Sequence, residues 1–355
     1  MGIELGLRTP AQKPRERWID VAKGIAIILV VFLHSTFDYR TSVHEWQWVD
    51  YSALLETFRM PLFFFTAGLF ASKVLSKSFR ELVNLRVLRF GWLYVLWSTL
   101  AVFILTPILV GWPGVAGTAG YLASMFVIPN PATWFIFAIT VYFLAAWPIR
   151  RLPLPVQVII GVALTLFFQS GLLTPADSEW AKVGKYFLFF LLAVEFGPRL
   201  RRWVPSLRWW HTLVAPIVYV AGVVLFRWIG WLNAPVGSPS QMAAWLVLSV
   251  LAVAAGCSVA LLVARWAAFD WLFWLGSRTL QVYLLHWYFL TIGWLAIAAV
   301  PVMPSAVVPF LAPLLTAFAI GGSLIVHRLT ERASFLYGKP AWLRLPARRV
   351  AAQQL

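Results

Sequence analysis

The sequence predicts an all-α membrane protein, a polytopic transmembrane helix bundle of about ten spans with both termini in the cytoplasm. Of its 355 residues, 61% are hydrophobic and only 12% are charged, whereas soluble domains average about 25% charged residues. The apolar residues form continuous runs instead of alternating with polar ones, which excludes a transmembrane barrel. The basic residues are concentrated in alternate loops, as in multi-span proteins. Composition, run length and charge placement therefore agree on one fold class.

Ten apolar runs have about the length that a bilayer-spanning helix needs. The first follows a polar, basic segment, residues 1–17, and no A-x-A-like cleavage site comes after it. We therefore expect a retained first span and not a signal peptide. The fourth and sixth runs are short. The expected spans are residues 18–37, 52–72, 90–110, 134–149, 155–173, 182–198, 211–232, 242–264, 271–299 and 305–326.

The basic residues follow the positive-inside rule at every expected crossing. With the N-terminus in the cytoplasm, the outer loops contain Arg40 and almost no other basic residue. These loops carry the acidic residues Asp38, Glu45, Asp50, Asp177 and Glu179. The cytoplasmic segments carry Arg8, Lys13, Arg15, Arg17, Lys73, Lys77, Arg80, Arg86, Arg89, Arg150, Arg151, Arg199, Arg201, Arg202, Arg208 and Arg265, with six more in the C-terminal tail. Membrane topology thus accounts for the net charge of +16, and no nucleic-acid partner is needed.

A single membrane-embedded domain is expected, because no linker or change of composition divides the chain. It covers residues 18–326, between a cytoplasmic N-terminal tail (1–17) and a basic cytoplasmic tail (327–355). Cys257 is the only cysteine, so no intramolecular disulfide can form. Its apolar surroundings in the sequence predict a buried structural thiol.

The first span carries three ionisable residues in the stretch WIDVAKGIAIILVVFLH. Lys23 and His34 are eleven residues apart, which is about three full turns, so they share one helix face about 16 Å apart along the axis. Asp20 lies one turn before Lys23 and can pair with it. Such residues cost about 2.5 to 3.5 kcal/mol each at the bilayer centre, so we expect this face to point into the protein. Taken singly, Asp20 and Lys23 could snorkel at the inner interface and His34 could cap the outer end.

The second span and the loop after it add four more charged candidates. Glu56 and Arg59 lie in the outer part of the second span, where they can pair with each other. Arg59 can instead hold an anionic or carbonyl oxygen beside His34. Arg86 and Arg89 lie one turn apart at the start of the third span, and paired guanidinium groups suit phosphate. Ordinary positive-inside signalling would also explain this arginine pair.

The ninth span contains the stretch WLGSRTLQVYLLHWYF, in which polar residues interrupt an apolar helix. Gly276 and Ser277 predict a break near the inner side. Gln281 and His286 follow, and His286 falls near mid-membrane. A supporting role in a site and a plain core role both fit His286.

These motifs resemble those of the acyltransferase-3 family of membrane-bound acyltransferases, which includes bacterial sugar O-acetylases. Asp20, Lys23 and His34 match the first-span signature, although many members have Arg at the position of Lys23. The stretch FRMPLFFFTAGLF is similar to the second-span motif, and Arg86-Val-Leu-Arg89 is similar to the RxxR element. TWFIFAITVYFL and WLGSRTLQVYLLH are similar to later landmarks. The resemblance covers residues 17–326 and is closest to the short, ten-span members that lack an extracytoplasmic hydrolase-like domain.

The resemblance implies transfer of an acyl group, commonly acetyl, from cytoplasmic acyl-CoA to a carbohydrate hydroxyl at the outer face of the bacterial inner membrane. The implied phosphate-binding residues are Lys23, Arg86 and Arg89. His34 would act as general base or as transient acyl carrier, and Arg59 would orient it or stabilise the oxyanion. The supporting residues would be Asp20, Glu56, Gln281 and His286. Acyl-CoA (acetyl-CoA) is expected as a co-substrate, without a permanently bound cofactor or metal.

A different class of function also fits intramembrane charges and a broken helix, namely a transporter or flippase for a lipid-linked sugar. The sequence shows no inverted repeat, and its phosphate-binding candidates cluster on one side, which favours the acyltransferase. The acceptor stays open at this stage between a polysaccharide repeat, a lipid-linked sugar, a glycolipid and a small amine-bearing molecule.

Overall fold

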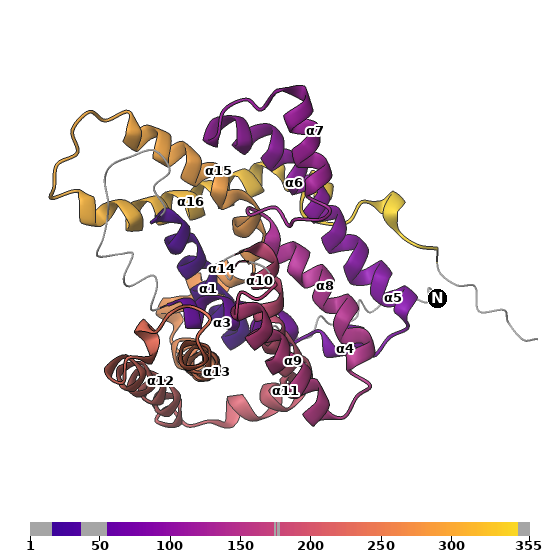
Figure 1. The fold of residues 1–355 in the computed structure, drawn as a ribbon, viewed down its shortest axis with the longest axis vertical. Coiled ribbons are helices and arrows are strands. Elements are labelled where there is room, and N and C mark those ends of the chain that lie inside the picture. The colour runs from indigo at the N-terminus through magenta and orange to yellow at the C-terminus, as the bar shows by residue number, and fades with distance from the viewer. Residues whose placement is uncertain (1–15, 37–54, 174, 176–177, 347–355) are drawn as a thin grey trace, which may run out of the picture.

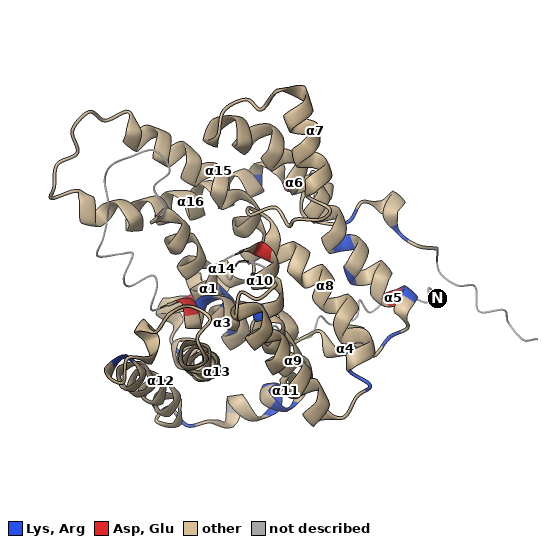
Figure 2. Cartoon of the chain, in the orientation of Figure 1, with Lys and Arg blue, Asp and Glu red and all other residues tan. Residues whose placement is uncertain are grey.

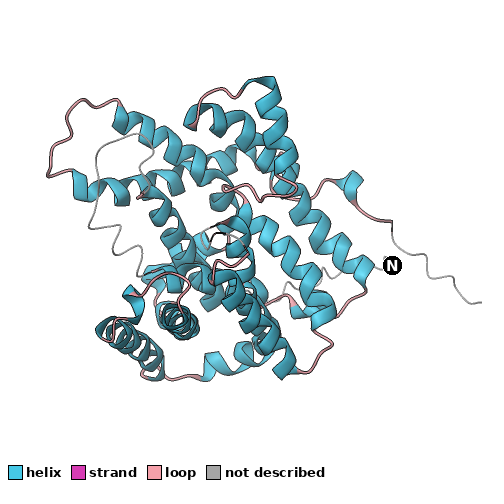
Figure 3. Ribbon diagram, viewed as in Figure 1, coloured by secondary structure: helices cyan, strands magenta, loops and turns pink. Residues whose placement is uncertain are grey.

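The computed structural model describes residues 16–36, 55–173, 175 and 178–346. Every regular element within these residues is helical (Figure 3), which confirms the all-α class. The α-helices are α1 (Arg17–Ser35), α3 (Glu56–Gly68), α4 (Ser72–Leu75), α5 (Phe79–Leu82), α6 (Leu88–Leu109), α7 (Gly114–Ser124), α8 (Trp134–Ile149), α9 (Leu154–Gln169), α10 (Glu179–Lys185), α11 (Phe187–Trp203), α12 (His211–Trp228), α13 (Pro239–Val263), α14 (Asp270–Gly276), α15 (Thr279–Ala298) and α16 (Val308–Thr330). A π-helical turn, η1 (Val83–Val87), joins α5 to α6. The outer-loop residues Asp38, Arg40, Glu45, Asp50 and Asp177, and most of the predicted N-terminal tail, lie outside the described residues.

A helix lies at each of the ten predicted spans, but the helices differ in length. Six segments of the described chain have the length and hydropathy of a membrane span: α1, the continuous segment Phe79–Leu109, α12, α13, α15 and α16. The apolar helices α8 and α9 are shorter. Helix α3 has 13 residues, and the sixth run is divided between α10 and α11 at Tyr186. The structure is therefore that of a helical membrane protein with six candidate spans.

Helix α1 occupies the middle of the bundle, where it contacts α3, α13, α14, α15 and α16. Figure 1 shows α12 and α13 side by side at one edge and α15 paired with α16 at another, with α1 between the two pairs. Charged residues are sparse on the helices (Figure 2). Buried residues of α1 include Asp20 as well as Ile19, Ile27 and Val31, so the polar face of this helix points into the protein as predicted.

Two glycines let α1 and α14 pack backbone against backbone. A Cβ atom at Gly276 would lie 1.6 Å from the carbonyl oxygen of Asp20, and one at Gly24 would lie 2.5 Å from that of Leu272. Helix α14 ends at Gly276 and α15 begins at Thr279, which confirms the predicted break. Because α14 is held against the start of α1, the following helix α15 runs along α1 and carries His286 to it.

Substitution of Gly276 by Ala is expected to destabilise the protein. The new methyl group would overlap the Asp20 carbonyl, and overpacking of this kind costs about 1 to 3 kcal/mol or more. The matched control is Gly321→Ala in α16, where nothing lies within 4 Å of the new Cβ. Thermal unfolding in detergent should give a lower midpoint for Gly276→Ala and an unchanged or higher one for Gly321→Ala. Equal midpoints for the two variants would contradict the close α1–α14 contact.

The segment after the last helix packs against the start of α6. Helix α16 runs to Thr330, four residues past the end of the predicted membrane domain at residue 326. The indole Nε1 atoms of Trp92 and Trp97 donate hydrogen bonds to the carbonyls of Phe335 and Leu336, at 2.8 and 2.7 Å. The side-chain oxygen of Asn84 accepts hydrogen bonds from Lys339 Nζ at 2.6 Å and from the backbone N–H of Leu345 at 3.0 Å. The described part of the basic tail is thus anchored beside the arginine pair.

Cys257, predicted as a buried structural thiol, lies at a cavity wall. Its side chain is half-buried and lines a cavity between α11, α12 and α13. The cause is the placement of α12, which packs mainly on α13 and leaves room between itself and α11. Apolar neighbours in the sequence could not reveal this space.

Candidate active site

The centre of the candidate site is a contact between two histidines. His34 lies near the end of α1, and His286 lies on α15. The Nδ1 atom of His34 is 3.0 Å from the Nε2 atom of His286, and the two rings stack with their centroids 5.1 Å apart. His286 is fully buried. The structure thus brings together two predicted residues that are 252 positions apart in the chain.

The hydrogen bonds of the pair define the tautomer of each neutral ring. His286 Nδ1 lies 2.7 Å from the Tyr283 carbonyl and 3.2 Å from that of Val282. A carbonyl can only accept, so His286 Nδ1 carries the proton and His286 Nε2 is the acceptor. His34 must then donate from Nδ1, which leaves the lone pair of His34 on Nε2. This is the arrangement that a general base or a nucleophile needs.

The predicted partner of Lys23 is present one turn away. Lys23 Nζ is 3.1 Å from Asp20 Oδ1, with the carboxylate buried. The pair lies about three turns below His34 on the same helix, so the charged end and the histidine end of the site are joined by one face of α1.

A polar pocket of about 520 Å³ opens beside Lys23. It adjoins a second pocket of about 390 Å³ that shares Lys23, Phe70 and Arg89 with it and is otherwise lined mainly by aromatic and aliphatic residues. We call the two together the cationic pocket. Its charged and amide side chains are Glu16, Asp20, Lys23, Lys73, Arg86, Arg89, Arg201 and Gln281. All three predicted phosphate-binding residues and Gln281 therefore line one space.

The cationic pocket has more positive than negative charge. Of its two carboxylates, Asp20 pairs with Lys23 and Glu16 lies 3.5 Å from Arg201. Burial raises the pKa of the Glu16 carboxyl above its ordinary value, while the charge and hydrogen bond of Arg201 oppose the shift. Loss of the negative charge of Glu16 on protonation would increase the positive potential of the pocket further.

Arg86 and Arg89 have no acidic partner within ion-pair distance among the described residues. Their guanidinium groups lie 5.7 and 5.8 Å from the rings of Phe143 and Phe90, and the Nε atom of each is buried without a hydrogen bond in the described structure. Arg86 lies in the π-helical turn η1, and such turns are frequent at functional sites. Two uncompensated guanidinium groups on one wall favour an anionic ligand.

Arg59 and Glu56 lie at the histidine end of the bundle. Arg59 is buried, at 3% exposed. Glu56 Oε1 lies 2.6 Å from Lys185 Nζ on α10. The sequence predicts that Glu56 can pair with Arg59, one turn away on the same helix. The pairing with Lys185 was not predicted, because Lys185 is far away in the chain.

The sequence also missed Lys73 and Arg201 as pocket residues. In the sequence each lies in a basic segment at the end of an apolar run, so each indicates only which side of the membrane that segment occupies. Arg201 reaches the pocket because the end of α11 lies beside Phe70, over whose ring the guanidinium packs at 4.9 Å. No local spacing in the sequence distinguishes this arginine from Arg199 or Arg202.

The fold and the site together define a helical membrane protein with a buried histidine pair and a pocket for an anionic ligand. The chain belongs to the acyltransferase-3 family, whose acyltransferase domain matches residues 16–328. This confirms the predicted family.

One relative is the inner membrane protein YcfT of Escherichia coli (strain K12), which is 23% identical over 165 residues. The match covers 40% of this chain and 46% of the relative, so it spans less than half of either protein. No solved structure matches the chain.

Proposed function

We propose that the protein transfers an acyl group, most simply acetyl, from acyl-CoA in the cytoplasm to a hydroxyl of a cell-envelope carbohydrate or glycolipid at the outer face of the bacterial inner membrane. The observation that carries this proposal is the histidine pair, with a lone pair on His34 Nε2, on the same helix face as a basic pocket.

The cationic pocket is suited to the phosphates of acyl-CoA. Arg86 and Arg89 would hold a phosphate through bidentate hydrogen bonds, and Lys23 would add a cation beside them. Lys73 lines the same space, so we add it to the proposed donor-binding residues. The flexible pantetheine arm would extend from here along α1 and bring the thioester toward His34.

The acyl transfer step follows from the tautomer of His34. Its Nε2 accepts the proton of the acceptor hydroxyl while the hydroxyl oxygen bonds to the thioester carbon. The C–S bond then breaks, and the sulfur of CoA leaves and takes the proton back from His34. If His34 is instead an acyl carrier, its Nε2 bonds to the acyl carbon while the C–S bond breaks and the CoA thiolate leaves. The acceptor hydroxyl then attacks the acyl carbon, the bond to Nε2 breaks, and the CoA thiolate takes up the hydroxyl proton. Arg59 would stabilise the negative charge that develops on the carbonyl oxygen.

Acetyl-CoA turnover by the purified protein in nanodiscs tests the proposal. Release of free CoA that depends on the protein, and a gain of acyl groups on envelope glycans in cells that express it, are the expected results. If CoA is never released while a lipid-linked sugar crosses the bilayer, the protein is a transporter. Intact mass after mixing separates the two roles of His34, because only an acyl carrier gains the mass of the acyl group.

Replacement of both Arg86 and Arg89 by Ala is expected to raise the KM for acyl-CoA about tenfold or more with a smaller change in kcat. The reason is that charge-assisted phosphate contacts are made in the ground state and the transition state alike. The matched control replaces two exposed arginines outside the pocket, Arg151 and Arg332, and should leave KM unchanged. A normal KM in a well-folded double variant would return Arg86 and Arg89 to a topological role.

The proposed orientation places the cationic pocket in the cytoplasm. Reporter fusions after Tyr39 and after Asp177, two loop positions outside the described residues, are then expected to report the outer side of the membrane. A cytoplasmic signal at either position would overturn the ten-span topology.

A further inference from the structure

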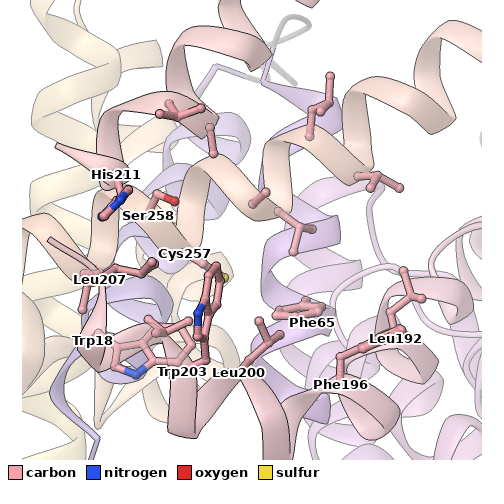
Figure 4. A pocket seen from close by; sticks show the side chains of 18 of the residues that line it. Trp18, Phe65, Leu192, Phe196, Leu200, Trp203, Leu207, His211, Cys257 and Ser258 are labelled. Atoms are coloured by element: carbon pink, nitrogen blue, oxygen red, sulfur yellow. The ribbon is translucent and has the colours of Figure 1, made fainter. Parts of the chain in front are cut away.

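A second cavity lies apart from the histidine site. It has a volume of about 970 Å³ and lies between α1, α3, α11, α12 and α13. We call it the apolar cavity. Its lining is almost entirely apolar and includes Trp18, Leu192 and Trp203, with Cys257 and Ser258 on the α13 side (Figure 4). Helix α12 forms its outer wall. It packs on α13, and its exposed apolar side chains, among them Val214, Ile217 and Val224, are available to lipid.

The depth of the apolar cavity corresponds to one leaflet of a bilayer. Along α13 its lining runs from Val250 to Leu261, which at 1.5 Å per residue is about 16 Å. The hydrocarbon core of a bilayer is about 30 Å thick, so the cavity extends from one end of the bundle to about mid-membrane. An elongated cavity of this length with a mainly apolar lining suits acyl chains.

A small cavity of about 280 Å³ adjoins the apolar cavity and shares Trp18 and Leu261 with it. Its charged lining residues are Glu16, Arg17, Arg201 and Arg265. Arg17 forms an ion pair with Asp270, and Arg201 lies 3.5 Å from Glu16. Arg265 has no acidic partner within ion-pair distance in the described part of the chain, and it donates a hydrogen bond to the Leu207 carbonyl. We call this small cavity, with Arg17, Arg201 and Arg265 in its lining, the basic mouth. If the acyl chains of a lipid filled the apolar cavity, the lipid headgroup would lie at the basic mouth.

Exposed tryptophans mark the same depth as a membrane interface. Trp203, Trp209 and Trp210 lie between α11 and α12 and are 60%, 59% and 47% exposed. Tryptophan is enriched at the headgroup level of membrane proteins. Arg201 of the basic mouth and this tryptophan cluster are close along the chain, so both belong at the headgroup level.

We propose that the apolar cavity binds the acyl chains of an anionic phospholipid, with the phosphate of the lipid at Arg201 and Arg265. An anionic headgroup complements the basic mouth, and arginine near a membrane surface contributes about 1 kcal/mol of attraction to anionic lipid. This site does not depend on the acyl transfer reaction. Because Glu16 and Arg201 also line the cationic pocket, the lipid phosphate would lie next to the donor site.

Native mass spectrometry of the protein released from nanodiscs tests this site. The nanodiscs contain equal amounts of phosphatidylglycerol and phosphatidylcholine with identical chains. We expect one phosphatidylglycerol to be retained in preference to phosphatidylcholine, whose choline cation cancels the charge of its phosphate. The expected ratio is about fivefold for each arginine at the headgroup. High salt should reduce this ratio. Equal retention of the two lipids by the unaltered protein would overturn the proposal.

Two kinds of variant separate the headgroup from the chains. Arg201→Gln with Arg265→Gln should remove the preference for phosphatidylglycerol, whereas the control pair Arg151→Gln with Arg332→Gln should keep it. Ala254→Trp places an indole ring in the apolar cavity and should reduce retention of both lipids. Because Arg265 also holds the α11–α12 connection, Arg201→Gln alone is measured as well and should lower the preference about fivefold. An unchanged preference in both arginine variants, or full retention in Ala254→Trp, would contradict the site.

Discussion

Replacing His34 by Ala is expected to reduce the rate of acyl transfer by at least about two orders of magnitude. A general base contributes about 10²- to 10⁴-fold, and a nucleophile that is removed costs no less. Binding of acyl-CoA should remain near normal, because the cationic pocket lies about three turns away along α1. The measurement is the turnover of acetyl-CoA in nanodiscs, together with the Kd for acetyl-CoA by calorimetry.

The His34→Ala result is interpretable only if the variant inserts and folds. Its thermal midpoint should therefore be compared with that of the unaltered protein, and Thr36→Ala, close to the same helix end, serves as a neighbouring control. A stable His34→Ala protein that transfers acyl groups at near the normal rate would end the assignment. His286 would then become the leading candidate for the catalytic residue.

Replacing His286 by Phe is expected to lower kcat about 10²-fold with little change in the KM for acyl-CoA. The phenyl ring fills the buried space but cannot accept the hydrogen bond from His34 Nδ1, and misplacement of a reacting group by about 1 Å costs about this much. His286→Gln should recover part of the rate, because its side-chain oxygen can accept the same hydrogen bond. In the proposed mechanism His286 would act through its contact with His34, as a positioning residue.

The rescue separates positioning from packing. If His286 only filled space, Phe would preserve activity better than Gln, since Phe is the better apolar filler. A variant order with Phe above Gln would thus contradict the tautomer argument, even if both variants lost activity. Thermal midpoints of both proteins control for a general loss of stability.

Much of the fold could be predicted from the sequence, because lipid allows few alternatives. Continuous apolar runs must satisfy their backbone hydrogen bonds internally, so they become helices, and a helix lies at all ten predicted runs. The lengths of individual helices were less predictable. Hydrophobicity alone did not show that α3 has 13 residues or that the sixth run is divided between α10 and α11 at Tyr186.

Part of the candidate site could also be predicted from the spacing of residues within one helix. Asp20 and Lys23 pair as their separation of three residues predicts. Helix α14 ends at Gly276 as expected. The backbone of α1 lies too close to Gly276 to leave room for a Cβ atom there. Helical periodicity is a local property, so it correctly placed Lys23 and His34 on one face of α1.

The sequence by itself determined a helical membrane protein, its family and the polar face of α1, since composition, periodicity and motif spacing are all carried by neighbouring residues. Only the tertiary structure decided that His286 contacts His34, that Glu56 pairs with Lys185, and that Arg201 joins the cationic pocket. These contacts join helices that are far apart in the chain. Their geometry depends on how closely whole helices pack, which no local pattern of residues records.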